Sequence, residues 1–244
     1  MNKNRKEFDF LAIPQEMSSL DPVTYQYFDK LLNKRTIVFN EGVDTDIVEM
    51  LILPLLDFEK DDSEEPVTLI IHTPGGSVSD GLSVLNIIDN YKKKLNIIVL
   101  GYAYSMGFAI LCAGSKNKNV TKKCYAFTTA LWHSGSVILS GDASMVNDVQ
   151  EFNRQIDEML KEYIIENTLI PRELYEKKER YQFYFTANEL LRYGIVDEII
   201  GEAKEPKLCK SCLLRNDCEN RIDYSYEIVD NNNFSCEEME PNVY

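Results

Sequence analysis

The chain has 244 residues, of which 44% are hydrophobic, so it is long enough to bury one substantial core. Its formal net charge of −14 disfavours binding to nucleic acids and to anionic membranes, since both would repel an acidic surface. Residues 1–20 contain no apolar run typical of a secretory signal, and no later stretch approaches the roughly 18 apolar residues of a membrane span. We therefore expect a cytoplasmic protein.

Helical and apolar segments alternate along the first half of the chain. The predicted elements, in chain order, are helix 21–34, strand 35–43, helix 44–60, strand 67–72, helix 77–94, strand 95–103 and helix 105–115. Such alternation is typical of βαβ units, whose strands form a parallel sheet. The sequence therefore predicts an α/β fold.

The second half begins with a strand predicted over residues 124–133, followed by a loop and a long helix over residues 144–168. The long helix carries one apolar stripe, made of Met145, Val149, Phe152, Ile156, Met159 and Tyr163. Another helix is predicted to begin at Pro171, and a short helix and a closing strand fall within residues 185–200.

Three regions follow from this pattern. We expect an N-terminal segment over residues 1–20, one folded domain over residues 21–202 and an acidic tail over residues 203–244. The tail has no sustained apolar period, so we expect it to be appended to the domain rather than part of its core.

Two short motifs each lie where a predicted strand gives way to a helix. Residues 73–77, TPGGS, contain two glycines, which let the backbone turn sharply and expose an amide that can hold an oxyanion. Residues 101–107, GYAYSMG, place Ser105 at a helix start beside the Met106 amide. Each motif also has a simpler interpretation, a strand-to-helix turn for the first and a serine N-cap for the second.

The sequence has two histidines, His72 and His133. His72 lies inside a predicted strand, where we expect a packed or hydrogen-bonded role. His133 ends a strand and enters a Ser-Gly-Ser loop, which suits a general base that must reach a nucleophile on a neighbouring element. His133 is therefore the better candidate for a base.

Together these motifs resemble the Clp protease proteolytic-subunit family, over about residues 25–200. The resemblance rests on the PGGS turn, the YSMG motif, the histidine that ends the next strand and the segment FTANELLRYGIVDEI. It implies a crotonase-like layered fold of repeated ββα units and a serine endopeptidase that works through an acyl-enzyme. It places the nucleophile on Ser105, the base on His133 and the oxyanion-hole amides on Gly76 and Met106.

The resemblance also implies an assembly and partners. Heptameric rings would pair into a double ring that closes a chamber, with the long helix at the ring-to-ring contact, and the substrates would be peptides or unfolded proteins. Family members also receive substrates from an AAA+ unfoldase, whose loops dock on aromatic residues in the strand before the PGG turn. The matching positions here hold Thr68 and Ile70, so docking to a standard unfoldase stays open. No cofactor is expected for catalysis.

One departure concerns the Asp that orients the histidine in this family. Counting back from FTAN, the corresponding position is Lys178, and a charged lysine cannot accept a hydrogen bond from imidazole. Either Glu176 or Glu179 takes the role, or the triad is incomplete. The segment between the nucleophile and the base is also longer than usual, and we assign the excess to a loop at residues 116–123.

The tail carries four cysteines, Cys209, Cys212, Cys218 and Cys236. Four thiolates can bind a structural zinc ion or, as a less favoured choice, an iron–sulfur cluster, and a tail with few apolar residues would gain its folding energy from the metal. The spacings that follow the Cys-x-x-Cys pair match no strong template, so free thiols are the alternative.

Three alternatives to an active peptidase remain for the function. The first is a noncatalytic or scaffold subunit, and the second is an ATPase-independent processing protease. The third is an acyl-CoA hydratase or isomerase, which shares the layered fold but would need acidic residues near the oxyanion hole that these motifs do not supply.

Overall fold

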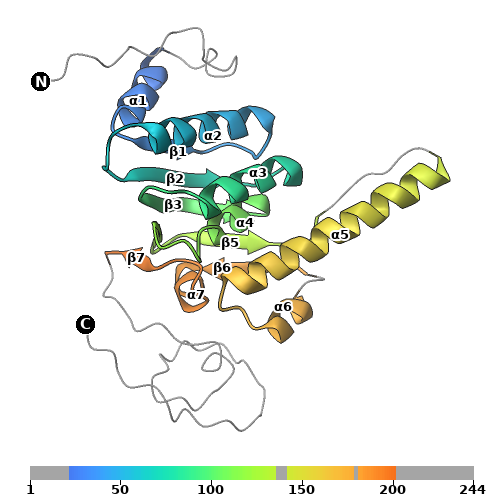
Figure 1. Ribbon diagram of the computed structural model, residues 1–244. Coiled ribbons are helices and arrows are strands. Elements are labelled where there is room, and N and C mark those ends of the chain that lie inside the picture. The colour runs from blue at the N-terminus through green and yellow to red at the C-terminus, as the bar shows by residue number, and fades with distance from the viewer. Residues whose placement is uncertain (1–21, 136–141, 179–180, 202–244) are drawn as a thin grey trace, which may run out of the picture.

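The computed structural model describes residues 22–135, 142–178 and 181–201, and the structural statements below concern these residues (Figure 1). The strands are β1 (Thr36–Phe39), β2 (Val67–Thr73), β3 (Leu95–Tyr104), β4 (Val120–Tyr125), β5 (Thr129–Trp132), β6 (Phe183–Thr186) and β7 (Glu198–Ile200). The helices are α1 (Pro22–Leu32), α2 (Thr45–Lys60), α3 (Val78–Asp89), α4 (Met106–Cys112), α5 (Ala143–Asn167), α6 (Arg172–Lys178) and α7 (Ala187–Arg192).

The strands form one sheet in which most neighbours run parallel, as the sequence predicts. The order β1-β2-β3-β4-β7 is parallel throughout. β5 also pairs parallel with the end of β3, whereas β6 pairs antiparallel with β5. β3 therefore has two successive partners along one edge, β4 beside its first half and β5 beside its last residues.

β4 and β5 correct the prediction of one strand from Cys124 preceded by a loop at 116–123. β4 begins at Val120, and its residues alternate between buried and exposed positions. The alternation could not be recognised from sequence because one inward position is Lys122, and lysine is rarely buried without a partner. The Lys122 Nζ lies 2.5 Å from Ser115 Oγ, which gives the buried ammonium a hydrogen-bond partner.

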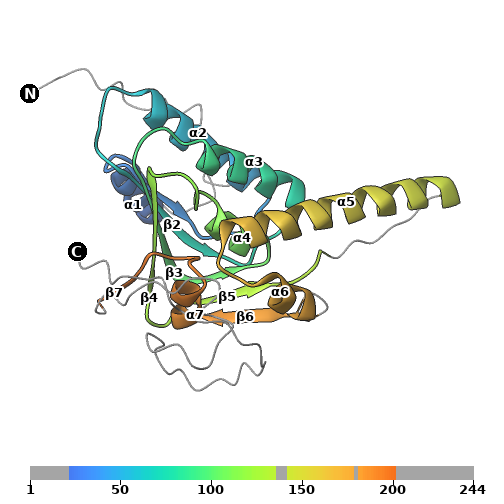
Figure 2. The same cartoon turned by 60° about the horizontal axis from the view of Figure 1, so that its bottom comes forward.

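Three helices, α2, α3 and α4, lie together on one face of the sheet (Figure 2). The core beneath them includes Leu69, Ile71, Ile97 and Val99, which are fully buried on β2 and β3. All seven residues of α4 are also buried. Full burial of one such side chain contributes roughly 1.5–3 kcal/mol, so this packing holds the ends of β2 and β3 where both motifs lie.

The long helix α5 projects from the body of the molecule (Figure 1). Only its second half joins the core, through Leu160 and Ile164. Three members of the predicted apolar stripe are exposed, with relative accessibilities of 55% for Met145, 60% for Phe152 and 47% for Met159. The predicted long helix is confirmed. These three residues of its apolar stripe, however, face away from the core of this subunit.

The segments 1–20 and 203–244 and the tail cysteines lie outside the described residues, so the predictions made for them stay predictions. Within the described part of the chain, no helix has both the length and the apolar character needed to cross a membrane.

Candidate active site

Ser105 joins the end of β3 to the start of α4 with a backbone conformation that is rare for serine. Its φ is 53° and its ψ is −122°, outside the regions that residues with a Cβ normally occupy. A conformation of this kind costs about 1–3 kcal/mol and persists where the surrounding structure holds it. The Ser105 amide donates to the Leu131 carbonyl at 2.7 Å, which ties the turn to β5. Ser105 is the N-cap residue of α4, but its side chain makes no capping hydrogen bond, so its hydroxyl is not used to close the helix end.

The two glycines of the PGG turn are required by close backbone approach. Gly75 has a φ of 85°, and a Cβ there would come within 2.4 Å of the Tyr104 carbonyl oxygen and 2.8 Å of the Met106 nitrogen. Gly76 has a φ of 154°, and a Cβ there would come within 2.3 Å of the Val43 carbonyl oxygen. A side chain at either position would therefore push two backbone segments apart.

The amides predicted to form an oxyanion hole belong to neighbouring backbone segments. Met106 opens α4, and the first N–H groups of a helix have no acceptor within the helix. The Met106 nitrogen faces Gly75, the residue before Gly76. The structure therefore brings the turn and the serine motif together, although they are far apart in sequence.

Two residues that sequence reasoning missed hold the glycine turn in place. The Val43 amide donates to the Gly75 carbonyl at 2.9 Å, and its own carbonyl accepts from the Ser77 amide at 2.7 Å. The fully buried Thr73 donates its hydroxyl to the Glu41 carbonyl at 2.6 Å and accepts from the Gly75 amide at 3.1 Å. A threonine hydroxyl often accepts from the backbone amide two residues later in a turn. The role of Thr73 in this turn could therefore have been predicted from sequence.

His133 lies just beyond the end of β5, the strand that pairs with the last residues of β3 before Ser105. Tyr104 pairs with Leu131 in the parallel register between β3 and β5, so the serine and the histidine follow the same end of two neighbouring strands. The His133 Nδ1 lies 2.7 Å from the Ser134 carbonyl oxygen. Because a carbonyl only accepts, Nδ1 carries the proton in this contact, and in the neutral ring Nε2 then has the free lone pair.

The acidic candidates for a third residue have different surroundings. Glu176 lies 3.7 Å from the Lys161 ammonium and 4.0 Å from the Arg172 guanidinium, so its carboxylate faces cations of α5 and α6. Lys178 ends α6, with Nζ 5.8 Å from the centre of the Phe183 ring. Glu179 lies outside the described residues.

His72 has the packed role that its strand position predicts. Its ring lies 4.0 Å from the Tyr102 ring, centre to centre, and a Cβ on Gly101 would come within 2.8 Å of Nδ1. This packing leaves His133 as the histidine that lies beside the serine turn.

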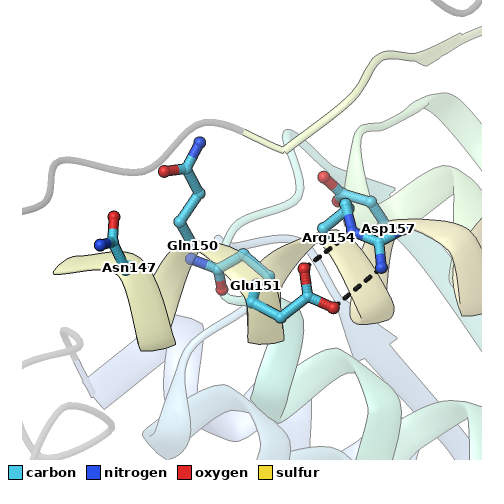
Figure 3. A pocket seen from close by; sticks show the side chains of 6 residues that line it. Asn147, Gln150, Glu151, Arg154 and Asp157 are labelled. Carbon is cyan, nitrogen blue, oxygen red and sulfur yellow. Dashed lines mark hydrogen bonds and ion pairs between the residues drawn. The ribbon is translucent and has the colours of Figure 1, made fainter. Parts of the chain in front are cut away.

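A polar hollow of about 410 Å³ lies along α5 (Figure 3). It is lined by Asn147, Gln150, Glu151, Asn153, Arg154 and Asp157. Hydrogen bonds from Arg154 at 3.0 and 2.8 Å lower the pKa of Glu151 to about 2. Burial raises the pKa of Asp157, and a Cβ on Gly135 would lie 3.4 Å from its carboxylate. One lining residue, Asp157, therefore lies beside the segment after His133, but none of the six lining side chains carries a hydroxyl or a thiol.

The combination of a mostly parallel α/β sheet, a serine held at positive φ, a tight glycine turn and a neighbouring histidine suits a hydrolytic enzyme. Comparison with known proteins agrees. A family model described as Clp protease matches residues 19–203. The ATP-dependent Clp protease proteolytic subunit 2 of Thermobifida fusca is 30% identical over 181 residues, which cover 74% of this chain and 88% of that protein.

A second relative, the ATP-dependent Clp protease proteolytic subunit 1 of Prochlorococcus marinus, is 29% identical over 199 residues, or 79% of this chain and 96% of that protein. The chain therefore belongs to the Clp protease family, as the sequence motifs predict.

Proposed function

We propose that the chain is a serine endopeptidase in which Ser105 is the nucleophile. The observation that carries the proposal is the φ of 53° at Ser105, between a strand and a helix and directly against the glycine turn. Strained residues of this kind cluster at active sites, where the surrounding structure holds the side chain in the position that the chemistry needs. Membership of the Clp protease family and the mostly parallel α/β sheet are consistent with this role. A crotonase-like layered fold is part of the proposal.

The proposed reaction forms and then hydrolyses an acyl-enzyme. The Ser105 Oγ attacks the scissile carbonyl while His133 Nε2 takes the hydroxyl proton. The amides of Gly76 and Met106 donate to the oxyanion of the tetrahedral intermediate. His133 then gives the proton to the leaving amine, and a water molecule activated by the same nitrogen releases the acyl group from the serine.

The assembly that the family resemblance implies is part of the proposal. We propose heptameric rings that pair through α5 into a chamber. Three exposed apolar side chains on one projecting helix, Met145, Phe152 and Met159, support it, since exposed apolar groups on a soluble surface are typical of contacts with a partner. The substrates would be peptides or unfolded proteins in the cytoplasm, delivered by an AAA+ unfoldase or entering without one.

The test is labelling with a fluorophosphonate probe, which phosphonylates activated serines with loss of fluoride. We expect Ser105→Ala to abolish labelling and peptide hydrolysis, and His133→Ala to lower the labelling rate by about 10²- to 10⁴-fold, because the serine loses its base. Ser79→Ala is the matched control, because Ser79 is an exposed serine on α3 whose loss should leave labelling unchanged. Labelling of the Ser105→Ala protein at the wild-type rate would show that another residue is the nucleophile.

A noncatalytic subunit is the second candidate function. It is favoured by one observation, namely that Lys178 carries an ammonium where the sequence count places the acid that orients the histidine. Such a subunit would fold and assemble but show no labelling in either the wild type or the Ser79→Ala control, so the same experiment separates the two functions.

A further inference from the structure

The proposed base needs an acceptor at Nδ1, because that contact fixes which ring nitrogen carries the proton. In the structure the acceptor is the Ser134 carbonyl, 2.7 Å from Nδ1. A backbone carbonyl selects the useful tautomer, in which Nε2 can take a proton. It carries no full charge, however, so it stabilises the imidazolium that forms during acylation less than a carboxylate would.

The sheet register shows which residue faces His133 from the next strand. β5 and β6 are antiparallel, with Leu131 opposite Tyr184 and Trp132 opposite Phe183. Continued by one residue, the register sets Gln182 opposite His133. Residues directly opposite in an antiparallel pair place their side chains on the same face.

A hydrogen bond supports this placement of Gln182. Its Oε1 accepts from the Tyr184 hydroxyl at 2.5 Å, so the two side chains lie on one face of the chain, two residues apart. Tyr184 is opposite Leu131, and His133 lies two residues beyond Leu131 on that same face. The side chain of residue 182, just before β6, therefore occupies the face from which an acceptor would reach the imidazole.

We propose that His133 works without a carboxylate partner, with the Ser134 carbonyl fixing its tautomer, and that residue 182 is the position from which an acid would complete the site. This inference rests on the proposed serine peptidase function. In this proposal neither Glu176 nor Lys178 contacts His133. The Glu176 carboxylate faces Lys161 and Arg172, and Lys178 ends α6.

The inference predicts a gain of activity from Gln182→Glu, which keeps the shape of the side chain and adds a negative charge. The Tyr184 hydroxyl can donate to the new carboxylate as it does to Gln182. A carboxylate beside an imidazole raises the pKa of the imidazolium by about one unit, which corresponds to about a tenfold gain in its stabilisation. The labelling rate should rise by a similar factor, and the acidic limb of the pH–rate profile should move to higher pH.

The experiment measures the fluorophosphonate labelling rate against pH for wild type, Gln182→Glu, Gln182→Asp, Glu176→Gln and Glu179→Gln. Lys178→Glu is the matched control, since it places the same charge at the end of α6 instead. We expect the gain and the pH shift in at least one of the two residue 182 variants. Glu176→Gln, Glu179→Gln and Lys178→Glu should label within about twofold of the wild-type rate.

A tenfold loss in Glu176→Gln or Glu179→Gln would overturn the inference, because a carboxylate would then already orient the histidine. A gain in Lys178→Glu without a gain in either residue 182 variant would also overturn the inference. Wild-type labelling rates and pH profiles in both residue 182 variants would overturn it as well. Because Ser105→Ala tests the nucleophile separately, loss of this inference would leave the proposed function standing.

Discussion

The tight approach between the PGG turn and the serine turn predicts that Gly75→Ala damages the active site. A Cβ at residue 75 would come within 2.4 Å of the Tyr104 carbonyl oxygen and 2.8 Å of the Met106 nitrogen, both distances below any normal contact. The positive φ of 85° alone costs an alanine about 1–2 kcal/mol. The backbone must also move by several tenths of an ångström, and this movement displaces the proposed oxyanion amides.

Gly201→Ala separates these two effects. Gly201 has a similar φ of 90°, but a Cβ there meets nothing within 4 Å. This variant should therefore lose about 1–2 kcal/mol of unfolding free energy and label at the wild-type rate. We expect Gly75→Ala to lose about 1–2 kcal/mol more and to label about 10²-fold more slowly, because displacing one oxyanion donor costs that much.

Thermal unfolding and fluorophosphonate labelling of the two variants, side by side, provide the assay. Equal losses of stability and equal labelling rates would refute the reasoning, since Gly75 would then be needed for its φ alone. Loss of stability without loss of labelling would show that the turn holds the fold but does not position the reacting groups.

Two further predictions concern stability and metal content. Burial alone would raise the pKa of Asp61, but hydrogen bonds from Lys93 and Arg35 outweigh burial and lower it, so the ionised form stabilises the fold at neutral pH. Asp61→Asn should lower the melting temperature at pH 7, and its difference from wild type should shrink as pH falls below the ordinary aspartate value of 3.8, whereas the exposed Asp62→Asn should change little at either pH. For the tail, we expect about one zinc ion per chain, lost on replacing Cys209 and Cys212 by serine; elemental analysis that finds no metal in chelator-free protein would support free thiols.

Most helices and strands were predictable because their apolar patterns are local. The apolar runs predicted as strands are confirmed as β2 and β3, and burial alternates along β2 and over residues 95–100 of β3. The helix predicted over 44–60 is confirmed as α2, although Pro54 lies inside it. Buried side chains such as Leu51 and Leu55 hold that helix against the core. Tertiary packing thus outweighs the local cost of the proline.

β4 was missed for the opposite reason. Its inward residue Lys122 gains partners that lie elsewhere in the chain, including Ser115 Oγ. No local pattern marks such a lysine as buried, because its ammonium is satisfied only after the chain has folded. The strained φ of Ser105 was equally hidden, since backbone dihedrals are not read from residue types, whereas the choice of Ser105 and His133 as candidates needed only their positions after predicted strands.

The partner of His133 depends on sheet register, which a count along the chain cannot supply. Counting back from FTAN placed Lys178 in the acid's position, on the assumption that residues preceding the motif keep one fixed path. In the structure Lys178 ends α6, and the chain resumes as β6 at Phe183, opposite Trp132. The residue beside the base is then decided by cross-strand pairing, in which each step along one strand moves the partner one step back along the other. On this physical ground we expect an acid that assists His133 to belong at residue 182, where this chain has a glutamine.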